Sequence, residues 1–235
     1  MTEPPSPDTN PTAPTKASEA ASELNNLLQI ISGASTMLDK AQDNPETYLQ
    51  MLREAIQRAE LISADLNREV GGSTAQQPSQ AELSKFRRME KPAQSAPARE
   101  TIMVVDDEPM TVILLKTILE EAGYAVATAN SGFECLDLFR ANPLRYSLIM
   151  LDLTMPFLNG EETFQRLKEI RADVSVVLCT GFIQSERLDR MMSTGLAGFL
   201  RKPVPVEEVE STVRAILAKL RYSGGMNPRA VPAIS

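Results

Sequence analysis

The 235-residue sequence contains no histidine and no tryptophan, and it contains only two cysteines. Structural and catalytic zinc ions are held by Cys and His side chains, so this composition nearly excludes a zinc site. Cys135 and Cys179 both lie within apolar segments, and we expect buried free thiols in a reducing compartment. Aromatic residues make up only 5% of the chain, so aliphatic and Met side chains must fill the core.

The sequence also lacks an excess of basic residues and any long apolar run. Its net charge is -7, which argues against nucleic acid as a partner, because binding to phosphates requires a basic surface. No apolar run approaches the ~20 residues that span a bilayer. The N-terminal "MTEPPSPDTNPTAPTK" has no apolar segment of the kind found in secretion signals. We therefore expect a cytoplasmic protein that contacts neither membrane nor nucleic acid.

Residues 18–72 show two helical patterns with heptad spacing. The positions in the first pattern are Leu24, Leu28, Ile31, Ser35 and Leu38, and those in the second are Tyr48, Leu52, Ala55, Ala59, Ile62 and Leu66. Asn44 and Pro45 suit the start of the second helix, and Gly71–Gly72 its end. An antiparallel hairpin of this kind is too thin to bury both of its faces. We expect it to pair with a second copy in a four-helix bundle.

The rest of the chain divides into two tails, a linker and a second domain. Residues 1–17 and 222–235 are expected to be disordered tails, and residues 73–99, rich in Ser, Ala, Gln and Pro, a linker. Residues 100–221 alternate short apolar runs with amphipathic helical patterns. The runs are "TIMVV", "AVATA", "SLIML", "SVVLC" and "GFLR", and the helices are expected near 109–122, 131–141, 160–171, 186–194 and 205–221. This order predicts an α/β fold with a five-stranded, parallel, doubly wound sheet.

In that fold, functional residues gather where the strands end. Asp106–Asp107, Asp152, Thr180 and Lys202–Pro203 follow four of the five predicted strands. Carboxylates ~4 Å apart repel by about 4 kcal/mol at an effective dielectric constant of 20, and Mg²⁺ would relieve that repulsion. The set suits phosphoryl transfer to Asp152, with Mg²⁺ and Lys202 neutralising the transferred charge. The alternative, acids that only cap strands or helices, explains a lone Asp pair better than this ordered set.

The motifs "MVVDDEP", "LIMLDLTMPFLNGEE", "VVLCTGF" and "GFLRKP" resemble those of receiver domains in two-component response regulators. The resemblance covers residues 101–221, about half of the chain. It implies that Asp152 is the phosphoacceptor and that Asp106, Asp107, Asp152 and the Thr154 backbone carbonyl bind Mg²⁺. It also implies that Thr180 and Phe199 form a switch pair, that Lys202 contacts the phosphoryl group, and that Pro203 follows a cis peptide bond. The implied donor is a sensor histidine kinase or a phosphotransfer protein, with no small-molecule substrate beyond phosphodonors.

The hairpin resembles the dimerisation and phosphotransfer module of sensor histidine kinases, through "SELNNLLQIISGASTMLD" and, more weakly, "AELISADLNRE". In that family the motif begins with a histidine, followed by Glu or Asp and then Asn. Here Glu23 and Asn26 are in place, but Ser22 stands where the histidine would be. The linker also has no room for an ATP-binding domain, so we expect no histidine kinase activity.

Ser22, Asn26, Gln29 and Gly33 fall on one helical stripe, which we expect to be polar and exposed. Three hypotheses remain for this stripe. The hairpin serves for dimerisation and for docking a kinase or receiver; or Asn26, next to Glu23, orients a water for phosphatase attack on an aspartyl phosphate; or these are ordinary surface residues.

The sequence as a whole predicts a phosphorelay response regulator that accepts a phosphoryl group on Asp152 and switches protein–protein contacts. Residues 222–235 are too short for a DNA-binding domain, so we expect no DNA-binding output. A homodimer through residues 18–72 is the expected assembly. The alternatives are a hairpin with phosphatase activity towards receiver aspartyl phosphate, or a protein that draws phosphate from a kinase. The receiver itself is expected to catalyse its own phosphoryl uptake and hydrolysis.

Overall fold

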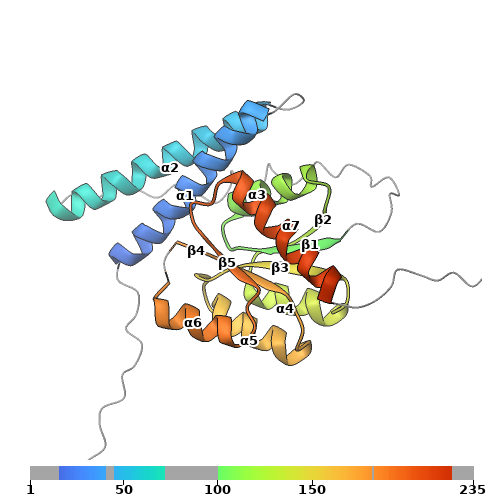
Figure 1. Cartoon of the computed structure of the whole chain (residues 1–235). Helices are drawn as coiled ribbons and strands as arrows, with labels where there is room; N and C mark the ends of the chain where they lie inside the picture. Colours follow the sequence, from blue (N-terminus) through green and yellow to red (C-terminus); the bar gives the residue numbers. More distant parts are fainter. Residues whose placement is uncertain (1–15, 41–44, 72–99, 182, 224–235) are drawn as a thin grey trace, which may run out of the picture.

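The structure is a computed structural model that describes residues 16–40, 45–71, 100–181 and 183–223 (Figure 1). Its elements are α1 (Lys16–Lys40), α2 (Pro45–Gly71), β1 (Thr101–Val105), α3 (Pro109–Glu121), β2 (Ala125–Ala129), α4 (Gly132–Ala141), β3 (Tyr146–Asp152), α5 (Gly160–Ile170), β4 (Val176–Thr180), α6 (Ser185–Ser193), β5 (Gly198–Arg201) and α7 (Val206–Ser223). Most of the predicted tails and linker lies outside the described residues. Residues 16–17 and 222–223, placed in the tails by the sequence, are helical because α1 and α7 continue through them.

The predicted α/β fold is confirmed. The five strands pair in parallel in the order β2-β1-β3-β4-β5. Such a sheet has helices on both faces, so its strands are apolar in both directions and β4 is buried along its whole length. The strand order reverses between β1 and β3, and a site is expected in the crevice beyond the carboxyl ends of these two strands.

Alternate strand residues contribute to two apolar clusters, one on each face of the sheet. Ile102, Val104 and Met150 pack with α3 and α7, whereas Met103, Val105 and Ile149 pack with α4, α5 and α6. Figure 1 shows the same division, with α3 and α7 on one side of the strands and α4, α5 and α6 on the other. Successive side chains of β1 and β3 point to opposite faces of the sheet, so each strand packs against both groups of helices that flank the site.

A tight loop returns the chain from β3 to α5 directly behind the site. The Gly160 amide donates to the Leu153 carbonyl over 2.9 Å, and a Cβ atom at Gly160 would lie only 2.3 Å from the Asp152 carbonyl oxygen. Only glycine permits this approach of two backbones. Asn159 then begins α5 with a capping box shared with Glu162. These contacts hold the segment that follows Asp152 in place.

The hairpin lies against the same face of the sheet as α3 and α7. Its buried α1 residues are Leu27, Ile30, Ala34 and Met37, and its buried α2 residues are Tyr48, Met51 and Ala55; all belong to one cluster with α3 and α7. The predicted seam of α1 is therefore misplaced, since Leu28 is 51% exposed and Ser35 is exposed. The heptad pattern accounts for a partner helix alone, whereas α1 packs between α2 and the sheet face that carries α3 and α7.

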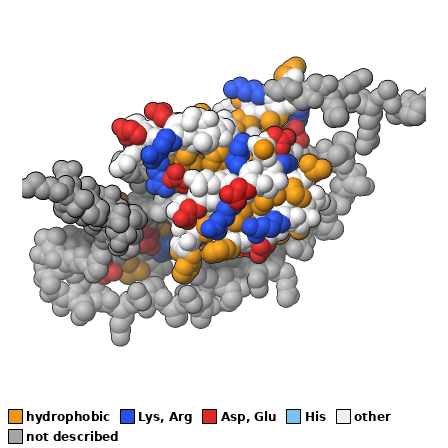
Figure 2. Space-filling view, turned by 90° about the horizontal axis from the view of Figure 1, so that it is seen from below, with side chains coloured by type: hydrophobic (Ala, Val, Ile, Leu, Met, Phe, Trp, Pro, Cys, Tyr) orange, Lys and Arg blue, Asp and Glu red, His pale blue; other side chains and the backbone are white. Residues whose placement is uncertain are grey.

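None of the helices in the described ranges is long and apolar enough to cross a membrane. Figure 2 shows one face of the molecule, the underside of the view in Figure 1, on which Lys and Arg side chains lie among Asp and Glu side chains. Positive charge on this face is therefore interspersed with negative charge rather than gathered in a stripe. That distribution agrees with the net charge of -7.

Candidate functional site

Four of the predicted site residues meet at the carboxyl edge of the sheet. Asp106 follows β1, Asp152 ends β3, Thr180 ends β4 and Lys202 follows β5. Their exposed fractions are 1%, 5%, 1% and 4%. Buried charges are costly unless they are paired, so this cluster must be held together by contacts among its own members.

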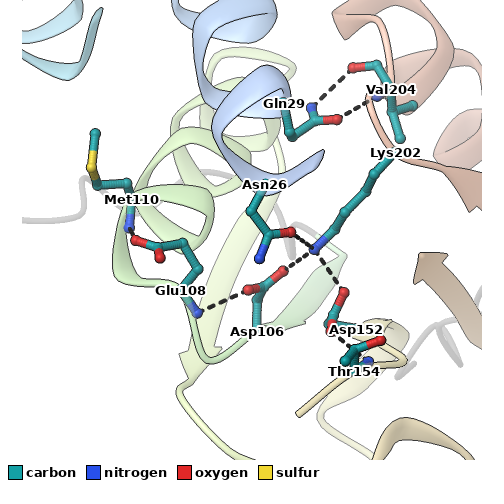
Figure 3. A network of polar contacts seen from close by, with 9 residues as sticks. All are labelled: Asn26, Gln29, Asp106, Glu108, Met110, Asp152, Thr154, Lys202 and Val204. Carbon is teal, nitrogen blue, oxygen red and sulfur yellow. Dashed lines mark hydrogen bonds and ion pairs between the residues drawn. The ribbon is translucent and has the colours of Figure 1, made fainter. Parts of the chain in front are cut away.

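The Lys202 ammonium group is the centre of those contacts (Figure 3). Its Nζ lies 2.7 Å from Asp106 Oδ2 and 2.6 Å from Asp152 Oδ1. A third bond, 3.1 Å long, goes to the Asn26 side-chain oxygen, which comes from α1. An ammonium group has three protons to donate, so these three bonds use its full capacity.

Burial and crowding shift the pKa values of the charged groups. Burial raises the pKa of Asp152 to about 7; Lys202 opposes this shift and the nearby Asp106 charge adds to it. Burial lowers the pKa of Lys202, but the charges of Asp106 and Asp152 outweigh that effect and raise it above its ordinary value. The pKa of Asp107 is raised by burial first and then by Asp106. Negative charge at this edge is therefore only partly compensated by the one lysine.

The remaining predicted receiver residues surround this cluster. The Thr154 backbone N–H donates to Asp152 Oδ2 over 2.7 Å, so both carboxylate oxygens of Asp152 accept a hydrogen bond. Asp107 is exposed at the rim, and Phe199, on β5, is 43% exposed. The peptide bond between Lys202 and Pro203 is cis, which confirms that prediction.

The donor set suits a hard divalent cation, although the side chains are not gathered around one point. Carboxylate oxygens of Asp106, Asp107 and Asp152 and a backbone carbonyl are the ligands that Mg²⁺ prefers. Burial, and after it the neighbouring Asp106 charge, raises the pKa values of Asp107 and Asp152, and a bound cation would favour their ionised forms. Across the described ranges, however, no three Asp, Glu, His or Cys side chains are grouped as a metal site. Here Lys202 lies between two of the three acids.

Two residues of the predicted polar stripe on α1 also reach the site. Asn26 contacts Lys202, and Gln29 makes two hydrogen bonds with the Val204 backbone, one to the carbonyl at 3.0 Å and one from the amide. Gln29 is only 1% exposed, and Gly33 is buried against Leu114 of α3. The expectation that this stripe is exposed is therefore wrong. The α/β domain of the same chain covers it, which a helical period alone cannot reveal.

Glu23 makes its contacts at a different point of the interface. Its carboxylate accepts from Arg58 over 3.2 Å, and Arg58 donates to both carboxylate oxygens of Glu108, each over 2.8 Å. The backbone N–H of Glu108 in turn donates to Asp106 Oδ1 over 2.9 Å. The hydrogen bond to Glu108 raises the pKa of Arg58 above its ordinary value. Glu23 thus belongs to a chain of contacts that joins α2 to the loop after β1.

Sequence reasoning did not identify Arg58 and Glu108, and it assigned Gln29 to the wrong environment. Glu108 directly follows the Asp pair and begins α3, where its side chain accepts from the Met110 amide. From the sequence, Glu108 can be recognised only as the N-cap residue of a helix, and nothing there predicts a partner on α2. Arg58 is one of several charged residues of an amphipathic helix. No local signal distinguishes it from the exposed Arg53.

The comparisons with known proteins agree with this geometry. Residues 102–214 match the family described as the response regulator receiver domain. The chain is similar to the transcriptional regulatory protein CpxR homolog of Haemophilus influenzae, with 34% identity over 50% of this chain and 50% of that protein. It is also similar to the chemotaxis protein CheY of Halobacterium salinarum, with 28% identity over 49% of this chain and 95% of that protein.

Solved structures give the same result for the fold. A response regulator receiver domain protein from Clostridium thermocellum superposes with a TM-score of 0.51 at 27% identity, over 53% of this chain and 98% of that one. The chain spans about half the length of the first transcriptional regulators that it matches, and 13% of the sensor histidine kinase RcsC of Escherichia coli. These matches are about as long as the receiver domain.

Proposed function

Residues 102–214 are a response regulator receiver domain of two-component signalling, and from this premise we propose that the chain accepts a phosphoryl group on Asp152. The donor is a phosphohistidine of a sensor histidine kinase or a phosphotransfer protein. The observation that supports this role most directly is the buried Asp152 carboxylate, held between Lys202 and the Thr154 N–H at the edge of the sheet. The result of phosphorylation is a change in protein–protein contacts.

The side chains around Asp152 have complementary tasks in the transfer. A carboxylate oxygen of Asp152 forms the new bond to phosphorus while the bond from phosphorus to the donor nitrogen breaks. Lys202, 2.6 Å from Asp152, neutralises charge on the transferred oxygens. Asp106, Asp107, Asp152 and the Thr154 carbonyl would hold Mg²⁺, which supplies further neutralisation of the equatorial oxygens when bound. Asp152 itself must be ionised to react.

Thr180 and Phe199 are the proposed switch. A phosphoryl group adds about two negative charges and three acceptor oxygens beside Asp152. The buried Thr180, at the end of the neighbouring strand, turns its hydroxyl towards these oxygens. Phe199 is 43% exposed and lies beside Leu178 in the sheet, so it rotates inward when Thr180 moves. The surface around α6 and β5 changes as a result.

A second candidate function is a phosphatase formed by the hairpin, and the position of Asn26 favours it. The Asn26 side-chain oxygen is 3.1 Å from Lys202 Nζ, which is itself 2.6 Å from Asp152. A carboxamide at this place can orient a water molecule for attack on the phosphorus of an aspartyl phosphate, and no histidine is required. Glu23, proposed alongside it, acts through Arg58 in this arrangement, by holding α1 and α2 on the receiver.

The proposed assembly is a homodimer through residues 18–72. The hairpin exposes Leu28 and Ile56, and Ile56 lines a shallow groove together with Ile31, Ala59, Glu60, Ser63 and Ala64. A second hairpin would cover this groove in a four-helix bundle. The net charge of -7 supports protein partners over nucleic acid, and the two buried free cysteines suit a reducing cytoplasm. A role as a phosphate sink for a kinase remains an alternative to switching contacts.

The proposal is tested by incubating the purified protein with acetyl phosphate and Mg²⁺ and measuring the acid-stable mass gain. Asp152→Asn is expected to abolish the gain, and Asp137→Asn, at an exposed acid of α4, to leave it unchanged. Removing Mg²⁺ with EDTA is expected to slow uptake strongly. A mass gain that persists in Asp152→Asn contradicts the assignment of the phosphoacceptor. For the second candidate, Asn26→Ala must slow the decay of the label after the donor is removed.

A further inference from the structure

The hairpin covers the phosphorylation site through contacts at four separate places on the receiver. We define the docking face by Glu108, Gly181, Lys202 and Val204. The contacts to this face are the double hydrogen bond of Gln29 to Val204, the double ion pair of Arg58 to Glu108, and the bond of Asn26 to Lys202. Asn25 lies against Gly181, where an added Cβ would be 3.2 Å from the Asn25 Cβ. The loops that follow β1, β4 and β5 are thus all contacted by one helix pair.

Lys202 links this docking to the chemistry of Asp152. Its three protons are already bonded to Asp106, Asp152 and Asn26. A phosphoryl group on Asp152 brings new charged oxygens, and Lys202 must release one of its present acceptors to bond them. The bond to Asn26 is the longest of the three and the only one to an uncharged acceptor, so it is the weakest. Phosphorylation therefore removes a contact of the docked hairpin.

The limited space around Asp152 supports the same conclusion as the hydrogen bonds of Lys202. With the hairpin docked, Asp152 is only 5% exposed, and Asn26 lies beside the Lys202 ammonium group that also bonds Asp152 (Figure 3). A phosphoryl group carries three oxygens beyond the carboxylate and has to enter this same space. Gln29, one turn further along α1, holds the helix at Val204 and so keeps the Asn26 position close to this space.

On these grounds, and on the premise that Asp152 is the phosphoacceptor, we propose that the docked hairpin and the phosphoryl group exclude each other. This proposal is incompatible with the phosphatase role of Asn26, the second candidate function, because that role requires Asn26 to stay beside the phosphoryl group. In the unphosphorylated protein the docking face is occupied in cis by α1 and α2. Phosphorylation of Asp152 displaces them, and the freed face then accepts a helix pair from another protein. By linkage, docking opposes phosphorylation by the same factor by which phosphorylation opposes docking.

A reversible cross-link tests this proposal in one molecule. Asn25→Cys and Gly181→Cys place two Cβ atoms within a few tenths of an ångström of the 3.5–4.5 Å range found in disulfides. Oxidation locks the hairpin on the receiver, and a reductant releases it. The initial rate of label uptake from acetyl phosphate and Mg²⁺ is expected to be about ten-fold lower in the oxidised form than in the reduced form, a factor equivalent to 1.4 kcal/mol. The decay rate of the label, measured after donor removal, corrects for any difference in hydrolysis.

The converse measurement uses the same variant. Labelled, reduced protein is expected to form the disulfide more slowly than unlabelled protein. Equal uptake by the oxidised and reduced forms overturns the proposal, and so does a pair of cysteines that does not cross-link in the unlabelled protein. Absence of uptake by the wild-type chain, in contrast, overturns the proposed function itself.

A second variant weakens docking without touching the neighbours of Asp152. Arg58→Ala removes the double ion pair to Glu108, whereas Arg53→Ala removes an exposed pair within α2. Uptake from acetyl phosphate is expected to be several-fold faster in Arg58→Ala and unchanged in Arg53→Ala. Equal rates for the two variants would contradict the proposal.

Discussion

The receiver and the hairpin bring polar residues to the same site by different routes. In the receiver, Asp106, Asp152 and Lys202 each follow a strand, and parallel pairing alone brings strand ends together. In the hairpin, Asn26 and Gln29 come from the middle of α1, where neither end of the helix positions them. The strand-end residues are therefore positioned by the sheet topology, whereas the α1 residues are positioned only by the docking of the hairpin. The predictions below separate these two kinds of placement.

The largest expected difference between the two regions is in phosphoryl uptake. Asp152→Asn removes the acceptor oxygen and is expected to reduce phosphoryl uptake to background, whereas Asn26→Ala is expected to retain uptake. Both are measured by mass gain with acetyl phosphate and Mg²⁺. If Asn26→Ala also loses uptake, the hairpin residue belongs to the acceptor machinery and the division between the two regions fails.

Lys202→Met is expected to produce the largest loss of stability. It leaves Asp106 and Asp152 buried without a cation, and breaking a buried pair in this way costs about 3–5 kcal/mol. The loss should shrink as the pH falls towards about 7. Burial raises the pKa of Asp152 to about 7 with the lysine in place, although Lys202 lowers it, so without Lys202 the carboxyl is protonated at a higher pH and loses its uncompensated charge. Urea unfolding at pH 5 and pH 8 in EDTA measures this loss in the free energy of unfolding. Lys219→Met, at an exposed lysine, is the control. A loss that is equal at both pH values would show that charge is not its cause.

A smaller loss of stability is expected from Gln29→Ala, which tests the buried hydrogen bonds between the hairpin and the receiver. Removing the amide leaves the Val204 N–H and carbonyl without their partner, at a cost of about 1–3 kcal/mol. The exposed Gln57 of α2 gives a matched control in Gln57→Ala. Hydrogen exchange at Val204 should become faster in Gln29→Ala alone. Unchanged exchange at this amide would show that α1 does not rest on the receiver in solution.

The smallest effect is expected at the edge of the interface. Lys40 and Glu207 form an ion pair of 3.0 Å between α1 and α7, but both side chains are largely exposed. Exposed pairs are screened by water and salt, so Lys40→Ala is expected to leave thermal unfolding unchanged. A clear loss, comparable with that of Gln29→Ala, would mean that docking depends on peripheral charge rather than on its buried contacts.

Particular residues show how far sequence reasoning reached. The five strands and their helices were predicted because apolar periodicity is a local signal, and the cis bond before Pro203 was implied by the resemblance to receiver domains. The heptad pattern of the hairpin predicted two helices but misplaced the buried side of α1, since Leu28 is exposed and Leu27 is buried. When a helix carries apolar residues on more than one side, the sequence allows more than one side to be buried. The surface against which the helix packs decides which side that is.

Local patterns along the chain are enough to specify the parallel sheet and the polar residues that follow its strands. Apolar runs of strand length can be satisfied only in a sheet covered on both faces, and the carboxyl ends of parallel strands share one edge. Only the tertiary structure decided that Asn26, Gln29 and Arg58 face that edge. Their contacts depend on how one folded surface fits another, which no spacing within either segment specifies.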